Sequence, residues 1–521
     1  MKFLKKRSST IIFLLISLLY ALSNIFYWKI NTPIIPKCID GIHFYDIFKE
    51  GLLYYNAPLM TWIMKAIFCI FGKQYFDLQI IILNYFFFII ALYFIYKIGV
   101  ELKNKETGNI AMILFALTPV VYGMSRQYGH QDWHVMIAMT INVYCLIKLN
   151  FFNDRKWSIL YGITVGLGLL VKDEFLPYFF TPWLYVAIKS LIEKTDLKKI
   201  INISLTIIIG ILIAGCHYFR TDIINKTLHE PIIETSPIFS FDSLRVTTIG
   251  LWEELLSPPI FLLFIIAVLW FIVSYRKNLK IVLLLWLIIP WAIITFMPHF
   301  KSSDYEIAII PAMILIISVF VSNLKNLKLK NFILFFTCFI CLLQFINFSY
   351  GSINLKIFNS YIKLNNHRIY YYNNDFIYRK KYNFDLTIDL VNKLKKYSNY
   401  SFLIYYYDDT LLQKDGIVSF ANINDINIFK NWDINIHDIY KTDIILKIGK
   451  QKNLEDVSKE EYNILSLNKK KENSIISQHF NNRLSVDNEI ENHFYLLDSF
   501  YLKDIKDPEY LVELYAKNKD F

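Results

Sequence analysis

Long apolar runs separated by short polar segments occupy the first two thirds of the chain. A helix of about 18 apolar residues is long enough to cross a hydrocarbon core of roughly 30 Å. The pattern predicts an α-helical polytopic membrane protein with about eleven transmembrane helices. The predicted spans are residues 11–28, 78–99, 108–123, 134–151, 157–172, 175–192, 200–219, 257–275, 280–297, 306–323 and 331–349.

The first apolar run follows a basic start, as in a signal peptide or a first membrane anchor. Ala21-Leu22-Ser23 resembles a cleavage site of small residues, but the apolar run continues to Trp28. We therefore expect a retained helix, with its basic start on the cytoplasmic side of the membrane.

The charged residues between the predicted spans alternate from loop to loop. Clusters of lysine and arginine occupy every second loop, on the side of the N-terminus, whereas the intervening loops hold isolated cations. Because cytoplasmic loops are enriched in lysine and arginine, the pattern agrees with eleven spans and puts the C-terminal tail outside the cytoplasm. The predicted location is the cytoplasmic membrane.

From Tyr350 the sequence becomes polar and the continuous apolar runs end. We predict a transmembrane domain over residues 1–349 and a small extracytoplasmic α/β domain over residues 350–521. In the second domain we expect an amphipathic helix at 386–396, strands at 401–407 and 443–448, and a closing helix at 508–517.

Composition supports this class of protein. The chain has 521 residues, of which 55% are hydrophobic, and a mean hydropathy of +0.36. Residues 350–521 hold 24 basic and 24 acidic residues, which leaves 55 − 24 = 31 basic and 44 − 24 = 20 acidic residues in the first 349. The net charge of +11 therefore belongs to the membrane part, and no basic patch with interleaved aromatics indicates a nucleic-acid partner.

The segment between the first two spans, residues 40–72, begins with polar residues and continues with aromatic and aliphatic residues at helical spacing. This pattern predicts external juxtamembrane helices that lie along the bilayer surface. Asp40, at its start, is a candidate catalytic base; the structural alternative is a helix N-cap. Asp46 is a second candidate base or substrate contact, although a position within a helix favours solvent exposure.

Polar residues also gather at the external ends of the later spans, where they are costly unless they face water or a partner. Four such loops could line a common vestibule. Besides Asp40 and Asp46, the candidate residues are Arg126, His130, Asp132, Lys172, Lys301 and Tyr305.

These residue types suit sugar transfer from a lipid phosphate. A carboxylate can take the proton of an acceptor hydroxyl, and a lysine or arginine can hold the phosphate leaving group as its charge grows. No glycine-rich phosphate loop, serine nucleophile elbow or HExxH motif is present in the sequence. The six cysteines form no paired CxxC zinc pattern.

Four segments together resemble the GT-C glycosyltransferases, which include protein O-mannosyltransferases, lipid A aminoarabinose transferases and related enzymes that use polyprenyl-phosphate sugars. The segments are the Asp40 loop ending in YYNAPLMTWIMKAIFCIFG, RQYGHQDWHVMIAMTINVYCL, GLGLLVKDEFLPY and HFKSSDYEIAIIP. The resemblance covers roughly residues 10–350. It implies a GT-C-like fold in which Asp40 is the catalytic base, Asp132 is the second external aspartate, and Lys172, Lys301 and Tyr305 match further positions.

The sequence departs from the family pattern in two places. Gly41 follows Asp40 where family members often carry an acidic residue, which weakens the case for a bound divalent metal ion. Asn56-Ala57-Pro58-Leu59 replaces a Pro-Pro-Leu motif that some members precede with a phosphate-binding lysine. The donor phosphate would then be bound by Lys172, Arg126 and Lys301. No cofactor is clearly required.

Structural alternatives remain for these residues. Asp132 could cap a helix, Lys172 could extend to the lipid headgroups, and Tyr305 could belong to an interfacial aromatic belt. His130 and His134 are four residues apart, as metal ligands on one helical face would be, but without a clear third ligand a hydrogen-bonding or substrate-binding role for His130 is favoured.

The sequence therefore predicts an inverting glycosyltransferase that moves a sugar from a polyprenyl phosphate to a lipid, glycan or protein acceptor at the outer face of the membrane. The alternatives are a polysaccharide polymerase or ligase, with its chemistry in residues 220–256, and a lipid-linked sugar transporter. Internal repeats and glycine- or proline-broken helices, which are typical of transporters, are not evident in the sequence.

Overall fold

A computed structural model describes most of the helical part of the chain and the main elements of its C-terminal part. The described residues are 2–31, 58–72, 76–126, 131–172, 174–193, 196–219, 241–277, 279–296, 303–350, 384–397, 401–406, 427–429, 444–450, 494–502 and 510–517. They fall into two compact units, a helical unit up to residue 350 and a C-terminal unit from residue 384, and each is described by itself.

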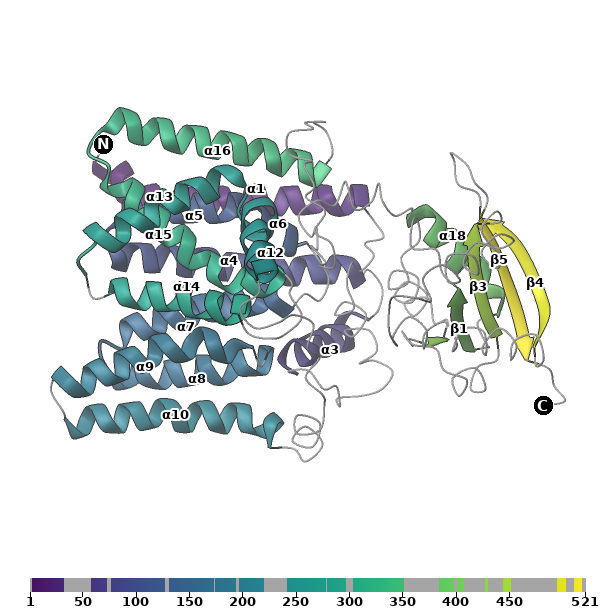
Figure 1. The fold of residues 1–521 in the computed structure, drawn as a ribbon, viewed down its shortest axis with the longest axis horizontal. Helices are drawn as coiled ribbons and strands as arrows, with labels where there is room; N and C mark the ends of the chain where they lie inside the picture. Colours follow the sequence, from purple (N-terminus) through teal and green to yellow (C-terminus); the bar gives the residue numbers. More distant parts are fainter. Residues whose placement is uncertain are drawn as a thin grey trace. The chain divides into compact units, whose positions relative to one another are not determined.

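The helical unit consists of long helices whose axes lie close to parallel (Figure 1). Shorter α-helices, one π-helix (η1) and one 3₁₀-helix (η2) connect or flank them. Its elements are α1 (Lys2–Asn31), α3 (Leu59–Phe71), α4 (Phe76–Leu102), α5 (Lys105–Leu117), α6 (Pro119–Met124), α7 (Gln131–Lys148), α8 (Arg155–Val171), α9 (Phe175–Glu193), α10 (Leu197–Tyr218), α12 (Phe241–Ile249), η1 (Gly250–Leu255), α13 (Pro258–Ser274), α14 (Leu279–Phe296), η2 (Ser303–Ile309), α15 (Ile310–Asn323) and α16 (Leu327–Tyr350).

Seven helical segments in the described part of the chain are long and apolar enough to cross a membrane. They are Ser9–Lys29, Leu78–Leu102, Phe175–Glu193, Leu197–Tyr218, Leu279–Phe296, Tyr305–Asn323 and Leu327–Ile346. These seven agree with predicted spans, which supports a multi-pass membrane protein.

The other four predicted spans also fall on helices. The span expected at 108–123 is interrupted where α5 ends before Thr118 and α6 begins with Pro119, which has no backbone N–H to continue α5. The remaining three correspond to α7, α8 and α13, of 18, 17 and 17 residues. The total of eleven spans therefore stays a prediction.

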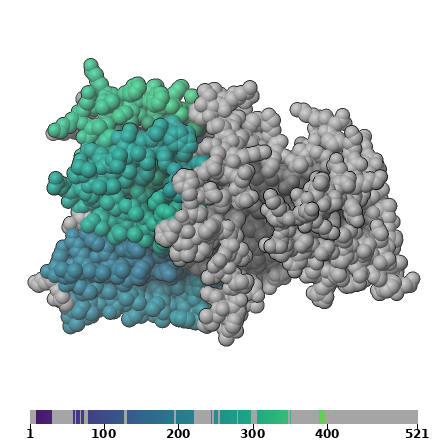
Figure 2. All heavy atoms as spheres, in the orientation of Figure 1, coloured from purple at the N-terminus to yellow at the C-terminus, as the bar shows by residue number. Residues whose placement is uncertain are grey.

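Helix α15 lies at the centre of the helical unit, and 89% of its candidate membrane span is buried. It packs against α5 and α13. The outer helices differ, since α1, α4, α10, α13 and α16 expose large apolar side chains. Figure 2 shows one face of this unit, which extends from α16 at the top to α10 at the bottom. These exposed apolar side chains are suited to contact with lipid.

Helix pairing in the unit does not follow the order of the chain. Helix α8 packs most extensively against α10, whereas α9, which connects them, packs mainly against α14. Gly166 permits the close α8–α10 contact, because a Cβ atom there would lie 2.6 Å from Cβ of Ile213.

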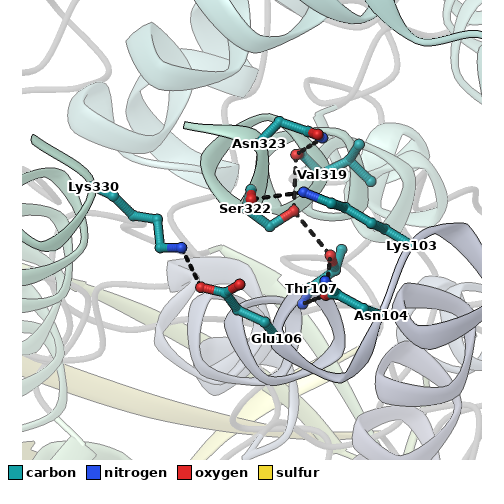
Figure 3. Close-up of polar contacts among 8 residues, drawn as sticks. All are labelled: Lys103, Asn104, Glu106, Thr107, Val319, Ser322, Asn323 and Lys330. Atoms are coloured by element: carbon teal, nitrogen blue, oxygen red, sulfur yellow. Dashed lines mark hydrogen bonds and ion pairs between the residues drawn. The ribbon is translucent and has the colours of Figure 1, made fainter. Parts of the chain in front are cut away.

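One end of the unit is joined by polar contacts among α4, α5, α15 and α16 (Figure 3). Lys103 donates to the carbonyl of Ser322 in the last turn of α15 at 2.7 Å, and Thr107 donates to the Ser322 hydroxyl at 2.9 Å. Lys330 pairs with Glu106 in the first turn of α5. Burial lowers the pKa of Lys103, an effect that Glu106 opposes and Lys330 reinforces.

The predicted juxtamembrane helices are described in part. Helix α3 begins directly after Pro58, whose carbonyl accepts from the backbone N–H of Trp62 at 2.9 Å. This helix agrees with the helical spacing of the sequence. Residues 32–57, which include Asp40, lie outside the described residues.

The C-terminal unit contains α18 (Phe384–Leu394), η4 (Lys395–Tyr397) and a five-stranded sheet. The strand order is β2-β1-β3-β5-β4, in which β1 pairs in parallel with β2 and β3, and β5 pairs antiparallel with β3 and β4. The strands are β1 (Ser401–Tyr406), β2 (Asn427–Phe429), β3 (Ile444–Lys450), β4 (Phe494–Leu502) and β5 (Tyr510–Lys517).

The amphipathic helix and the two strands predicted in this unit are confirmed as α18, β1 and β3. The closing helix predicted at 508–517 is wrong, since Tyr510–Lys517 forms strand β5. The segment contains helix-forming leucine, glutamate and alanine, but it lies between β3 and β4 and pairs with both. Pairing on two sides outweighs a weak local preference for helix.

Candidate active site

Lys172 is the centre of a charged cluster at one end of the helical unit. It is the C-cap of α8, and its extended backbone leaves the helix with the N–H bonded to the Gly168 carbonyl at 3.2 Å. Its Nζ lies 3.0 and 3.1 Å from the two carboxylate oxygens of Asp132 and 2.7 Å from Oε2 of Glu174. One ammonium thus bridges carboxylates from two segments that are 42 residues apart in sequence.

Asp132 lies in the first turn of α7, where the helix dipole favours a negative charge. Its side chain is 6% exposed, and that of Lys172 is 14% exposed. A charge pair this well buried is held in a defined geometry, and removal of one partner alone is expected to cost about 3–5 kcal/mol. Helix capping, the structural alternative predicted for Asp132, therefore does not account for its ion pair with Lys172.

The turn that carries Lys172 is closed by a tight contact between Gly168 and Phe175. A Cβ atom at Gly168 would lie 2.3–2.6 Å from three ring atoms of Phe175, which is fully buried. The backbone N–H of Phe175 also donates to the Lys172 carbonyl at 3.1 Å. Glycine at 168 lets the aromatic ring fold back over the last turn of α8 and thereby fixes the position of Lys172.

The 3₁₀-helix η2 brings a distant part of the chain to the same cluster. The Nζ of Lys172 lies 4.9 Å from the ring centroid of Tyr305, and the hydroxyl of Tyr178 donates to the Tyr305 carbonyl. The indole N–H of Trp286 donates to the carbonyl of Ala308 at 3.0 Å and anchors the other end of η2. Three of the predicted site residues, Asp132, Lys172 and Tyr305, are therefore brought together.

Glu306, next to Tyr305, adds a further carboxylate that is fully buried. Asp132, Glu174, Lys172 and Glu306 all lie within electrostatic range of the Tyr178 hydroxyl. The cluster thus combines a cation with three carboxylates and a phenol. Such a set can hold a positive group, position an ionic substrate and exchange protons.

Arg126, the other described cation of the predicted set, has different surroundings. Its side chain is buried and lies between the first and last helices of the unit. The guanidinium donates to Asn24 at 2.9 Å, to Ser23 at 2.6 Å and to Ser349 at 2.5 Å. It also stacks near three aromatic rings, those of Tyr27, Phe345 and Tyr350.

These contacts share no residue with those of Lys172, so Arg126 and Lys172 are not brought into one cluster by their described partners. The phosphate-binding role of Arg126 stays a prediction. In the structure the side chain links α6 to α1 and α16.

Asp40, Asp46, His130 and Lys301 lie outside the described residues, so their predicted roles are not tested here. Within the described part of the chain, no group of three histidine, cysteine, aspartate or glutamate side chains is placed to hold a metal ion. His134 is buried, and its ring meets that of Phe87 edge to face with centroids 5.0 Å apart.

Sequence reasoning did not select Glu306, Tyr178 or Gly168. Glu306 carried a signal, because an acidic residue at the start of an otherwise apolar span is costly without a partner. Tyr178 is one of 36 tyrosines and Gly168 one of 16 glycines, so neither stood out by residue type.

One family model matches part of the chain. The family model described as dolichyl-phosphate-mannose-protein mannosyltransferase matches residues 55–218, a region that contains Asp132 and Lys172. A search of curated proteins gave no significant match.

Three solved structures share the fold. ArnT from Cupriavidus metallidurans in the apo state is 11% identical, with a TM-score of 0.56 over 95% of this chain and 97% of that chain. The same protein bound to undecaprenyl phosphate gives a TM-score of 0.55 at 10% identity, with the same coverage. The apo oligosaccharyltransferase of Archaeoglobus fulgidus gives 0.53 at 11% identity, over 87% of this chain and 71% of that chain.

The family-model match over residues 55–218 agrees with the GT-C resemblance found in the sequence, and the solved structures show that the chain shares their fold.

Proposed function

We propose that the chain is an inverting glycosyltransferase that moves a sugar from a polyprenyl-phosphate donor to a lipid, glycan or protein acceptor. In the proposed reaction the acceptor oxygen attacks the anomeric carbon, and the bond from that carbon to the phosphate oxygen breaks. Asp40 accepts the proton of the acceptor, and the lipid phosphate leaves. The ArnT structure with bound undecaprenyl phosphate supports a donor of this class.

The observation that carries the proposal is the position of Lys172 between a buried and an exposed carboxylate. Asp132 holds the ammonium from the buried side, whereas the side chain of Glu174 is 41% exposed. An ion pair with one half-exposed partner is weaker than a fully buried pair and exchanges more readily. The donor phosphate therefore replaces Glu174 on Lys172, while Asp132 keeps the ammonium in place.

This exchange gives Lys172 a role in the transition state. Negative charge on the leaving phosphate increases as the sugar departs, so the contact with the ammonium strengthens during the reaction. Lys301 and Arg126 are the further cations predicted from the sequence to assist, although Arg126 already donates to three neutral side chains. Tyr305, His130 and Asp46 are the predicted contacts to the sugar or acceptor.

The test is the rate of sugar transfer against donor concentration in proteoliposomes. Lys172→Met should lower turnover by about 10²-fold and raise the donor KM, because a preorganised charge contact is lost. Glu174→Gln should lower the donor KM and preserve turnover, since a competing carboxylate is removed.

Lys189→Met is the matched control, because Lys189 pairs with Glu193 near the opposite end of α9. It should be nearly silent. If Lys172→Met shows the donor dependence of the natural protein, the phosphate is held by other cations. Mass spectrometry of lipids from cells that lack the protein should show an accumulated polyprenyl-phosphate sugar and thus identify the donor.

We also propose that the protein lies in the cytoplasmic membrane, with residues 350–521 outside the cytoplasm. The alternating loop charges support this orientation. A cysteine introduced at Ser398 should react with an impermeant reagent on intact cells. Reaction only after permeabilisation would contradict the orientation.

A further inference from the structure

A polar cavity of about 510 Å³, open to solvent, lies between the ends of α4, α7 and α8. It is lined by two carboxylates (Glu101 and Asp154), an ammonium (Lys148), two carboxamides (Asn150 and Asn153) and an indole (Trp157). Lys148 ends α7 and Asp132 lies in its first turn, so about 24 Å of helix separates this cavity from the candidate active site.

One wall of the cavity is a turn with an unusual backbone. Asn150, Phe151 and Phe152 have φ angles of 47, 54 and 61°, in the left-handed region that non-glycine residues seldom adopt. Two buried side chains hold this turn. Ser190 of α9 donates to the Phe151 carbonyl at 2.6 Å, and Asn202 of α10 donates to the Phe152 carbonyl at 2.7 Å. The wall is therefore fixed from behind by two other helices.

The charges around the cavity are balanced. Lys148 pairs with Glu101 at 3.1 Å, and Asp154 caps α8 by accepting from the Trp157 backbone N–H at 3.1 Å through one carboxylate oxygen. Lys97, one helical turn before Glu101, lies 5.3 Å from the ring of Tyr93. The lining itself holds one cation and two carboxylates, so it suits a ligand that carries both signs better than a purely anionic one.

An apolar strip on α4 leads to this cavity. Phe86, Ile90 and Tyr93 are 59, 37 and 44% exposed, and their spacing places them on one face of the helix together with Lys97. The strip is long enough to contact an acyl chain within the hydrocarbon region. A ligand with a polar zwitterionic end and an apolar tail would follow this path from α4 to the cavity.

We propose that the cavity binds the headgroup of a phospholipid that carries a primary ammonium and a phosphate. The ammonium lies against the carboxylate of Asp154 and the face of Trp157. The phosphate contacts Lys148 and the carboxamide of Asn150, and one acyl chain lies along Phe86, Ile90 and Tyr93. This site does not depend on the reaction at Lys172.

The test measures lipid binding to the purified, delipidated full-length protein by native mass spectrometry. Phosphatidylethanolamine, phosphatidylglycerol and phosphatidylcholine with identical acyl chains are compared at equal concentrations. Phosphatidylethanolamine should bind about two- to fivefold more than either of the others, as expected for partly exposed charge contacts.

Asp154→Asn should abolish this preference, because it removes the charge while asparagine still caps α8. Asp196→Asn is the matched control. Asp196 is likewise an exposed N-cap, of α10, and accepts from the Lys198 N–H at 3.1 Å. It should retain the preference, and both variants should unfold at the temperature of the natural protein.

Three results would overturn the proposal. Equal or stronger binding of phosphatidylglycerol would show that the ligand is simply anionic. An affinity for soluble phosphoethanolamine equal to that for phosphatidylethanolamine would show that the acyl chain contributes nothing. An unchanged preference in Asp154→Asn would exclude the cavity as the headgroup site.

Discussion

Lys172 and Arg126 are two cations that the sequence presents in the same way, each near the end of an apolar run. The structure gives them opposite surroundings. Lys172 meets two carboxylates, one of them exposed, whereas Arg126 donates to three neutral side chains and lies among three aromatic rings. The Glu174 partner of Lys172 can be exchanged for another anion, but the partners of Arg126 are matched to its planar, forked shape.

The comparison shows that charge and position near a membrane surface do not decide a cation's role. The partner set decides it, because an ammonium with a half-exposed carboxylate partner can exchange that partner for a phosphate. A guanidinium that already donates to neutral side chains instead holds together the helices that carry those side chains.

The first prediction separates the effect of Lys172 on turnover from its effect on protein stability through the ion pair. Lys172→Met alone would leave the buried carboxylate of Asp132 unpaired, so the change is made in an Asp132→Asn background. There, turnover should fall by a further factor of about 10²–10³, the usual effect of losing one preorganised charge contact. Turnover per folded enzyme is measured in proteoliposomes. An unchanged turnover would mean that Lys172 serves only to position Asp132.

The second prediction concerns Arg126→Met, which should act on stability. Loss of hydrogen bonds to a buried charged group is expected to lower the free energy of unfolding by about 2–3 kcal/mol. The donor KM of the folded enzyme should stay unchanged. Arg126→Lys should recover little stability, because an ammonium cannot form the same three bonds. If instead Arg126→Lys restores a lost donor affinity, the phosphate-binding role predicted from the sequence is supported.

The third prediction tests the turn that carries Lys172. Gly168→Ala forces the buried ring of Phe175 away and should cost about 1–3 kcal/mol, with reduced turnover because Lys172 moves. Gly215→Ala is the control. A Cβ there would lie 2.6 Å from the ring of Phe219, but that side chain is 72% exposed and can move at little cost. Equal effects of the two changes would remove the special role of the Gly168 contact.

The smallest effect is expected at the polar contacts of Figure 3. Lys103 donates to a carbonyl in the last turn of α15, where the helix dipole favours a positive charge. Lys103→Met should lower the free energy of unfolding by about 1 kcal/mol or less and leave turnover unchanged. A large loss of turnover would show that the two ends of the unit are coupled.

Much of the helical unit could be predicted from the sequence, because apolar runs of membrane length report directly on helices. The convergence of Asp132, Lys172 and Tyr305 also followed from placing their loops on one face. Their pairwise geometry did not, because the direction of a side chain at a helix end depends on contacts such as that of Gly168 with Phe175. Tyr178 was missed because nothing in its residue type distinguished it from the other tyrosines, whereas Glu306 could have been found as an acidic residue at the start of an apolar span.

Strand β5 shows a different limit. Its residues favour a helix locally, and only the presence of β3 and β4 on either side makes a strand the better state. Both partners lie outside the segment, since β4 ends several residues before β5 and β3 lies much earlier in the chain. The residue pattern of the β5 segment alone therefore gives no information about its pairing with β3 and β4.

The pairing of α9 with α14 has a consequence for biosynthesis. Helix α10 pairs with α8 soon after it is made, but the partner of α9 begins at Leu279, about 90 residues after Glu193, a delay of roughly 5–20 seconds at normal rates of translation. During that interval a face of α9 must be covered by lipid or by an insertion factor. Nascent chains that end before Leu279 should expose this face to crosslinking, and chains that extend beyond Phe296 should protect it.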